Sequence, residues 1–161
     1  MKNCSYYLFL FIFFGKFLCL SILINIPSLA QLPSEFQKIE LLTELKNSVD
    51  FEFAPDGRIF LLDRYGEVII YKPDTQILTT AGSLSVFSDL EDGLLAIEFD
   101  PDFVNNNYIY LHYSPLSTSV NRVSRFAMQG DQIDLASEVI VIEWPTQRVQ
   151  CCHAAGDLDF D

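Results

Sequence analysis

The sequence predicts an all-β fold built from repeated units of four short strands. Two segments, residues 51–61 and 97–111, carry the repeat: a strand ends in Phe-x-Pro-Asp, and a turn leads into a second strand rich in β-branched and aromatic residues. Phe53 and Phe99 are 46 residues apart (99 − 53), which leaves room for four strands in each unit. A four-stranded unit that recurs about every 40–50 residues is typical of a β-propeller.

The individual strands are runs of β-forming residues bounded by turn-forming residues. They are expected at 49–54, 58–63, 67–72 and 76–80 in the first unit, and at 94–99, 108–114, 120–127 and 138–144 in the second. Only partial alternation in 67–72 predicts a strand buried on both faces. A third copy of the motif begins at Leu158, so about two blades and the start of a third are expected.

Two alternatives compete with this interpretation. A β-sandwich could carry the same two Pro-Asp turns by chance, because such turns are common. The matched aromatic and aliphatic residues on both sides of the turns favour the propeller. Residues 36–45 could place their leucines and Ile39 on a helical stripe, but an edge strand that leads into the first unit is the favoured expectation.

The first thirty residues have the pattern of a secretory signal peptide. Lys2 precedes a long apolar run, expected to be helical, and Ser28 and Ala30 are small residues three and one before a cleavage site that we place after Ala30. An uncleaved membrane anchor is the alternative, although Lys16 would then lie inside the span. We expect an exported protein, periplasmic or extracellular, with a propeller region at 31–161 that meets a membrane only if the signal segment is retained.

Composition narrows the classes of function. The formal charge of −12 argues against nucleic-acid binding, and an apolar fraction of 50% argues against a disordered acidic tail. After cleavage two cysteines remain, Cys151 and Cys152, which are adjacent. They could form a strained vicinal disulfide in an oxidising compartment or stay reduced. A metal site is disfavoured, because Cys151, Cys152 and His153 lack the spacing of tetrahedral ligands.

An ordered series of motifs resembles the glucose/sorbosone dehydrogenase family, the soluble quinoprotein sugar dehydrogenases. The resemblance covers about residues 36–161. Its motifs are APDGRIF at 54–60, YGEV at 65–68, DGLLAI at 92–97, DPDF at 100–103, YIYL at 108–111, NRVSRF at 121–126, QR at 147–148, and CCH at 151–153 with Gly156. The order of the series is specific, whereas each motif alone is weak.

The resemblance implies a six-bladed propeller that binds pyrroloquinoline quinone (PQQ) and Ca²⁺ in a central crevice. Family members oxidise a sugar hydroxyl by hydride transfer to the quinone and pass electrons to an acceptor. His153, followed by Gly156, stands where the family carries its general base, a role that suits a side chain titrating near neutral pH. Without the resemblance, His153 would be read as a loop residue.

Two positions depart from the family pattern. Glu91 stands where some relatives carry a Gln that contacts the quinone, and a carboxylate there would repel the carboxylates of PQQ. An ordinary solvated turn residue is an equal interpretation of Glu91. Ala155 replaces a usual Gly and narrows the backbone angles available to that turn.

The length disagrees with a closed ring. Four blades need about 160–200 residues, whereas residues 31–161 number 131 (161 − 30). We therefore expect an N-terminal fragment, inactive alone, that lacks most ligands for PQQ and Ca²⁺. A non-catalytic propeller that binds carbohydrate or protein is the alternative.

Three residues of the expected strands are given structural roles. His112 is interpreted as structural, and Arg122 and Arg125 as residues for sheet packing or surface ion pairs.

Overall fold

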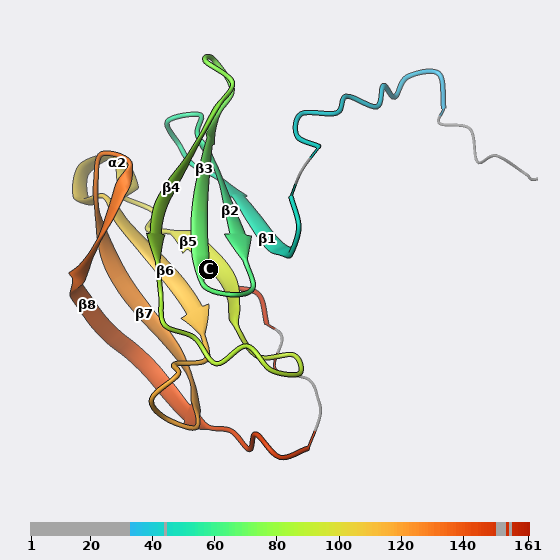
Figure 1. Ribbon diagram of the computed structural model, residues 1–161. Helices are drawn as coiled ribbons and strands as arrows, with labels where there is room; N and C mark the ends of the chain where they lie inside the picture. Colours follow the sequence, from blue (N-terminus) through green and yellow to red (C-terminus); the bar gives the residue numbers. More distant parts are fainter. Residues whose placement is uncertain (1–32, 44, 151–153, 155) are drawn as a thin grey trace, which may run out of the picture. The chain divides into compact units, whose positions relative to one another are not determined.

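The computed structural model describes residues 33–43, 45–150, 154 and 156–161 (Figure 1). The chain divides into two units, Met1–Leu41 and Leu42–Asp161, and the strands of the described residues belong to the second. The expected signal peptide, residues 1–30, lies outside the described residues. Within the described part of the chain, no helix has both the length and the apolar character needed to cross a membrane.

The first four strands form one antiparallel sheet in chain order. They are β1 (Ser48–Phe53), β2 (Ile59–Asp63), β3 (Glu67–Lys72) and β4 (Ile77–Ser83). The expected strands agree with these bounds to within three residues at every end. As the partial alternation predicted, β3 is buried on both faces: Val68 and Ile70 face one hydrophobic cluster and Tyr71 faces another.

The next four strands form a second antiparallel sheet, also in chain order. They are β5 (Leu94–Phe99), β6 (Tyr108–Tyr113), β7 (Val120–Gln129) and β8 (Gln132–Pro145), with the short helix α2 (Phe103–Asn106) between β5 and β6. The expected start of the last strand at 138 was wrong. A two-residue turn, in which Gly130 adopts a φ of 63°, pairs Gln129 with Gln132 and lets β8 begin at once.

The sequence repeat corresponds to equivalent strand positions. Phe53 ends β1 and Phe99 ends β5, each before a Pro-Asp turn. Their burial differs: Phe99 is 5% exposed and packs edge-on to Phe60 of the preceding sheet, with ring centroids 4.9 Å apart, whereas Phe53 is 61% exposed. Phe99 is buried because the first sheet covers it. Phe53 holds the equivalent position in the first sheet, and no described sheet covers it in the same way.

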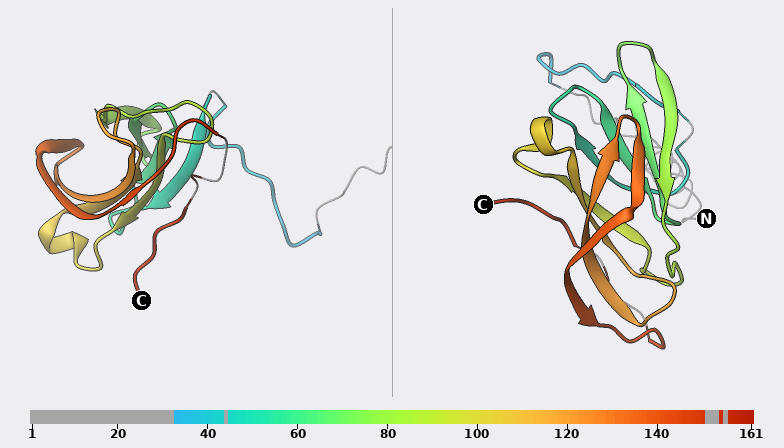
Figure 2. Two further views of the ribbon diagram at one scale, coloured as in Figure 1. Left: turned by 90° about the horizontal axis from the view of Figure 1, so that it is seen from below. Right: turned by 90° about the vertical axis from the view of Figure 1, so that its left-hand side faces the viewer.

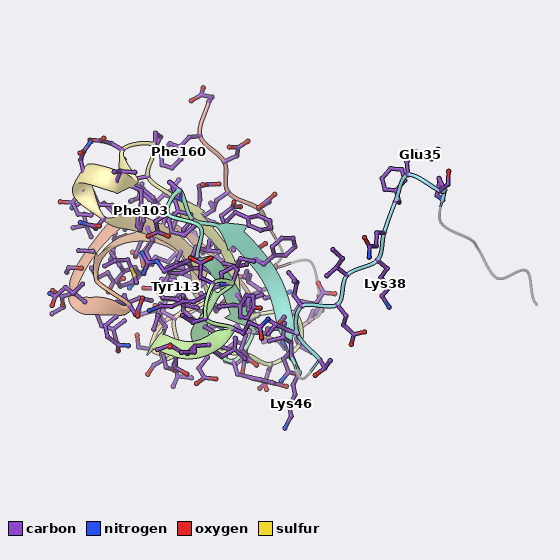
Figure 3. The ribbon with its side chains drawn as sticks, turned by 90° about the horizontal axis from the view of Figure 1, so that it is seen from above. Glu35, Lys38, Lys46, Phe103, Tyr113 and Phe160 are labelled. Atoms are coloured by element: carbon purple, nitrogen blue, oxygen red, sulfur yellow. The ribbon has the colours of Figure 1, made fainter. Side chains whose placement is uncertain are left out.

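The main core lies between the two sheets, which pack as two twisted layers (Figure 2). From β6, the core receives Ile109, Leu111 and Tyr113, while the alternate residues face the other side. Tyr113 and Phe103, labelled in Figure 3, are both almost fully buried. The expected all-β architecture of consecutive four-stranded blades is therefore confirmed.

The expected edge strand at 36–45 is wrong. The described residues of this segment carry neither strand nor helix, and Phe36 and Ile39 are 67% and 68% exposed. Their described backbone hydrogen bond, from Phe36 N to Pro33 O (3.0 Å), closes a turn. An extended segment becomes a strand only when its backbone groups join a ladder, and none is described for these residues. Leu158–Asp161, where a third unit is expected to begin, likewise carries no assigned strand.

Polar contacts tie the two sheets together at the end that carries the β1–β2 and β7–β8 turns. Asp131 of the second sheet pairs with Arg58 (3.1 Å) and with Lys72 of the first. Arg58 also donates to Gly130 O at 2.8 Å. Along the neighbouring strands, Asp50 of β1 accepts a hydrogen bond from Ile97 N of β5 at 3.0 Å.

Candidate functional site: the loop end of the two sheets

Three connections meet at the opposite end of the sheets, at the lower edge of Figure 1. We call them together the loop end: residues 84–93 between β4 and β5, residues 114–119 between β6 and β7, and residues 146–150 after β8. Backbone hydrogen bonds join the first two, from Phe87 N to Ser114 O (2.8 Å) and from Leu116 N to Ser85 O (3.0 Å). Another, from Thr146 N to Ser119 O (3.1 Å), joins the third.

Arg64, in the turn after β2, fixes the connection that carries Glu91. Its Nη1 donates to the carbonyls of Ser88, Leu90 and Asp92, each at 2.9 Å. One guanidinium thus satisfies several loop carbonyls that no ladder reaches. Glu91 itself is exposed between two of these anchored residues, so its backbone is fixed while its side chain faces outward.

Gly93 ends the same connection, and any residue with a Cβ is sterically disfavoured at this position. Its φ is 151°, and a Cβ there would lie 2.3 Å from Arg64 O. The close approach allows Leu94 N to donate to that carbonyl at 3.0 Å. The glycine of the DGLLAI motif therefore has a steric reason, which its place in the sequence did not indicate.

A buried polar chain crosses from the first connection to the second. Ser114 Oγ lies 2.6 Å from Asp92 Oδ1 and 2.6 Å from the side-chain amide of Asn121. All three residues are at most 5% exposed. The hydroxyl has one proton and donates it to the carboxylate, so the amide must turn its NH₂ group toward the hydroxyl. This chain holds Asp92, the neighbour of Glu91, against the second sheet.

Arg148 anchors the third connection to the other two. Its Nη2 donates to Pro115 O at 2.6 Å, and its guanidinium lies over the Phe87 ring, 4.2 Å from the centroid. Gln147 shapes the same segment, because its Oε1 accepts from Val149 N (3.1 Å) and Gln150 N (2.8 Å). Residues 147–150 are the QR motif and its continuation, so the chain that leads to Cys151 leaves from a fixed position.

The outward face of the second sheet carries His112. Its ring is 5.2 Å from that of Trp144, and a Cβ on Gly156 would lie 3.3 Å from it. Burial lowers the pKa of His112, which favours the neutral imidazole. Phe160 packs on Tyr110 of the same face, with centroids 5.1 Å apart. Residues 156–160 thus lie along β6.

The sequence-predicted site residues are only partly placed by this geometry. His153, Cys151 and Cys152 lie outside the described residues, so the general base and the vicinal disulfide stay predictions. Glu91 lies at the loop end. In the described ranges, no three His, Cys, Asp or Glu side chains gather to hold a metal ion.

The two strand arginines have the packing roles expected of them. Arg122 faces the core side of β7 and pairs with Glu138 (3.2 Å) and Glu143 (2.8 Å). Arg125 faces the other side, where its guanidinium lies 4.1 Å from the centre of the Tyr108 ring. The sequence alone indicated no role for Arg64 or Arg148. Their partners are backbone carbonyls, which every residue carries, so no particular residue type in the sequence marks the contact.

Comparison with known proteins gives the family context. A profile described as glucose/sorbosone dehydrogenase matches residues 45–161. Among curated proteins, quinoprotein glucose dehydrogenase B of Acinetobacter calcoaceticus is 31% identical over 80 residues, which cover 47% of this chain and 17% of the relative.

Solved structures show the same fold. A Thermus thermophilus oxidoreductase (glucose dehydrogenase) is 24% identical with a TM-score of 0.66, and the match covers 74% of this chain and 35% of that one. The PQQ-bound aldose sugar dehydrogenase of Streptomyces coelicolor is 22% identical with a TM-score of 0.55, over 65% of this chain and 32% of that one. The chain thus spans about a third of the length of these structures.

The described residues of the loop end do not by themselves fit an anionic quinone such as PQQ. Carboxylates of a ligand need cationic partners. The described hydrogen bonds of Arg64 and Arg148 go to backbone carbonyls, and Glu91 adds a negative charge. These residues therefore position the loops, and a quinone would take its cationic partners from elsewhere.

Proposed function

Since the chain belongs to the glucose/sorbosone dehydrogenase family, we propose that it forms one part of an exported PQQ-dependent sugar dehydrogenase. The observation that carries the proposal is the loop end, where Arg148 fixes the segment leading to His153 beside the connection that carries Glu91. Three anchored loops at one end of adjacent blades are suited to binding a small molecule.

In this proposal the chain's own contribution is to place a base. His153 would accept the proton of a sugar hydroxyl, and PQQ, if bound in the complete protein, would supply the hydride acceptor. Arg148 and Gln147 hold the backbone just before the histidine, and a base must lie within about 3 Å of the proton that it removes. Ca²⁺ would be bound by residues outside those described here.

We further propose that residues 31–161 alone do not oxidise sugars. The described strands form two blades, and the chain covers 35% and 32% of the two solved structures described above. The described hydrogen bond of Arg148, the cation of the loop end, goes to Pro115 O, so a competent site would need more of a propeller than these two sheets.

The decisive experiment uses the complete protein that contains these residues. Loaded with PQQ and Ca²⁺, it should reduce a redox dye when supplied with aldoses. His153→Ala should lower turnover about 10²–10⁴-fold, whereas Val149→Ala, at a 90% exposed neighbouring position, should leave it unchanged. No cofactor-dependent activity in the complete protein would overturn the proposal.

A non-catalytic propeller that binds carbohydrate or protein is the second candidate, and Glu91 favours it. A carboxylate at this position opposes an anionic quinone. Under this alternative His153→Ala would leave ligand affinity unchanged and no dye reduction would be seen, so the same variant separates the two functions.

Export is tested separately. If residues 1–30 are a signal peptide, the protein recovered from the periplasm or medium should begin at Gln31. Recovery of a membrane-bound protein that still carries Met1 would replace cleavage with anchoring.

A further inference from the structure

A cavity of about 270 Å³ opens between the two sheets, and Ser85, Pro115 and Ser117 line it on the side of the loop end. The end of β4, with Ser85 just beyond it, forms one wall. Arg122 and Glu138, from β7 and β8, form the other, and Leu135 contributes an apolar patch. By volume the cavity holds about nine water molecules, which is enough for one small ligand.

The charged wall is built by fixed contacts. Glu138 Oε1 accepts hydrogen bonds from Ser124 Oγ (2.7 Å), Arg122 Nη1 (3.2 Å) and the hydroxyl of Tyr113. Burial alone would raise the pKa of Glu138, but these donors outweigh it and hold the pKa below the ordinary carboxyl value. The described hydrogen bonds of this carboxylate all end on Oε1, so Oε2 is open to an additional donor.

The charges on Arg122 and its two carboxylate partners, Glu138 in the wall and Glu143 outside the cavity lining, select the kind of ligand. Arg122 contributes +1, while its two partners, Glu138 and Glu143, contribute −1 each. The sum of −1 disfavours an anion. Hydroxyl groups suit the wall, because each can donate to a carboxylate oxygen and accept from a guanidinium.

We propose that this cavity binds a neutral polyhydroxylated molecule no larger than a monosaccharide. One hydroxyl donates to Glu138 Oε2 and its neighbour accepts from Arg122. Ser85, on the facing wall, and Ser117, in the connection between β6 and β7, line the cavity and offer hydroxyls, and Leu135 contacts the C–H face of the ligand. Binding at this site requires no quinone and no oxidation, so the proposal can be tested independently of the proposed dehydrogenase activity.

Ligand-detected NMR and calorimetry on the full chain test the proposal, with D-glucose as the probe and inorganic phosphate as the anionic comparison. Glucose should bind with a Kd in about the millimolar range, and phosphate should not bind. Glu138→Gln should weaken glucose binding about tenfold or more. Glu143→Gln is the matched control: it removes the other ion pair of Arg122, but Glu143 is not among the cavity residues.

A second variant tests the cavity without touching the ion pairs. Leu135 is 45% exposed, so Leu135→Trp should fill the cavity and abolish binding while the melting temperature stays near that of wild type. Val104→Trp, at a 74% exposed position on α2, adds the same ring elsewhere and should bind normally. No glucose binding, equal losses in Glu138→Gln and Glu143→Gln, or binding unaffected by Leu135→Trp would each overturn the proposal.

Discussion

Replacing Asp131 with asparagine should loosen the contact between the two sheets and leave each sheet's own ladder intact. The carboxylate lies in the β7–β8 turn and pairs with Arg58 and Lys72 of the first sheet. Asparagine keeps the size and shape of the side chain but removes its charge. The variant therefore tests how much of the stability comes from polar contacts between neighbouring blades.

The expected loss is about 1 kcal/mol. The three side chains are between 15% and 35% exposed, and partly exposed ion pairs contribute roughly 0.2–1 kcal/mol each. Arg58 keeps its bonds to Asp56 (2.7 Å) and Gly130 O (2.8 Å), which limits the loss from that partner. For a unit of this size, 1 kcal/mol corresponds to a fall of about 4 °C in melting temperature.

Thermal and urea unfolding at low ionic strength measure the effect. Asp134→Asn is the control, because its described contacts, with Gln129 and Ala136, stay inside the second sheet. Salt near 1 M should shrink the Asp131→Asn effect. Equal destabilisation by the two variants, or a loss unchanged by salt, would refute the reasoning.

The same carboxylate gives a pH dependence. The hydrogen bond from Lys72 lowers the pKa of Asp131, with Arg58 acting in the same direction. Its stabilisation is therefore complete above the unfolded-state value of about 4 and is lost as pH falls through the lower folded-state pKa. The stability difference between wild type and Asp131→Asn should vanish in that acid range.

Two further substitutions test the loop end and the outward face. Gly93→Ala should lower the free energy of unfolding in urea by about 2–4 kcal/mol, because of the contact with Arg64 O and the strained φ. Gly57→Ala is the control: its Cβ would meet open space, so the loss should be about 1 kcal/mol. Equal losses in the two variants would contradict the steric argument. Burial and nearby carboxylates raise the pKa of Glu98, so its carboxyl destabilises the fold as pH rises from about 4.5 through the folded-state pKa. Glu98→Gln should gain stability relative to wild type between pH 4 and pH 7 in melting experiments, and a constant difference would exclude this effect.

Most of the strand pattern could be predicted from the sequence, because alternation and turn residues act locally. Pro55-Asp56-Gly57 and its neighbours delimit strands without reference to the rest of the chain. The two errors, at 36–45 and at the start of β8, both concern pairing. Pairing partners depend on what lies beside a strand in space, which residues 36–45 do not specify.

The candidate site was less predictable for a related reason. Glu91 and His153 were predicted only because the resemblance to the family implies functional groups at those motif positions. Arg64 and Arg148 donate hydrogen bonds to backbone carbonyls. Because every loop contains such carbonyls, the sequence does not indicate which arginine binds which loop. The buried chain from Asp92 to Asn121 joins residues 29 positions apart (121 − 92), so only the fold brings them together.

This form of anchoring separates the shape of the loops from the chemistry that they present. Arg64 holds the 88–92 backbone through carbonyl oxygens, so a change of side chain at Glu91 leaves those bonds intact. A residue at position 91 can thus set the charge at the loop end without altering the backbone of the loop. Under the proposed function, the charge at this end is the feature that would distinguish a quinoprotein dehydrogenase from a binding propeller. Glu91→Gln, which removes that charge and keeps the size of the side chain, should strengthen PQQ binding in the complete protein about tenfold if the quinone carboxylates lie nearby.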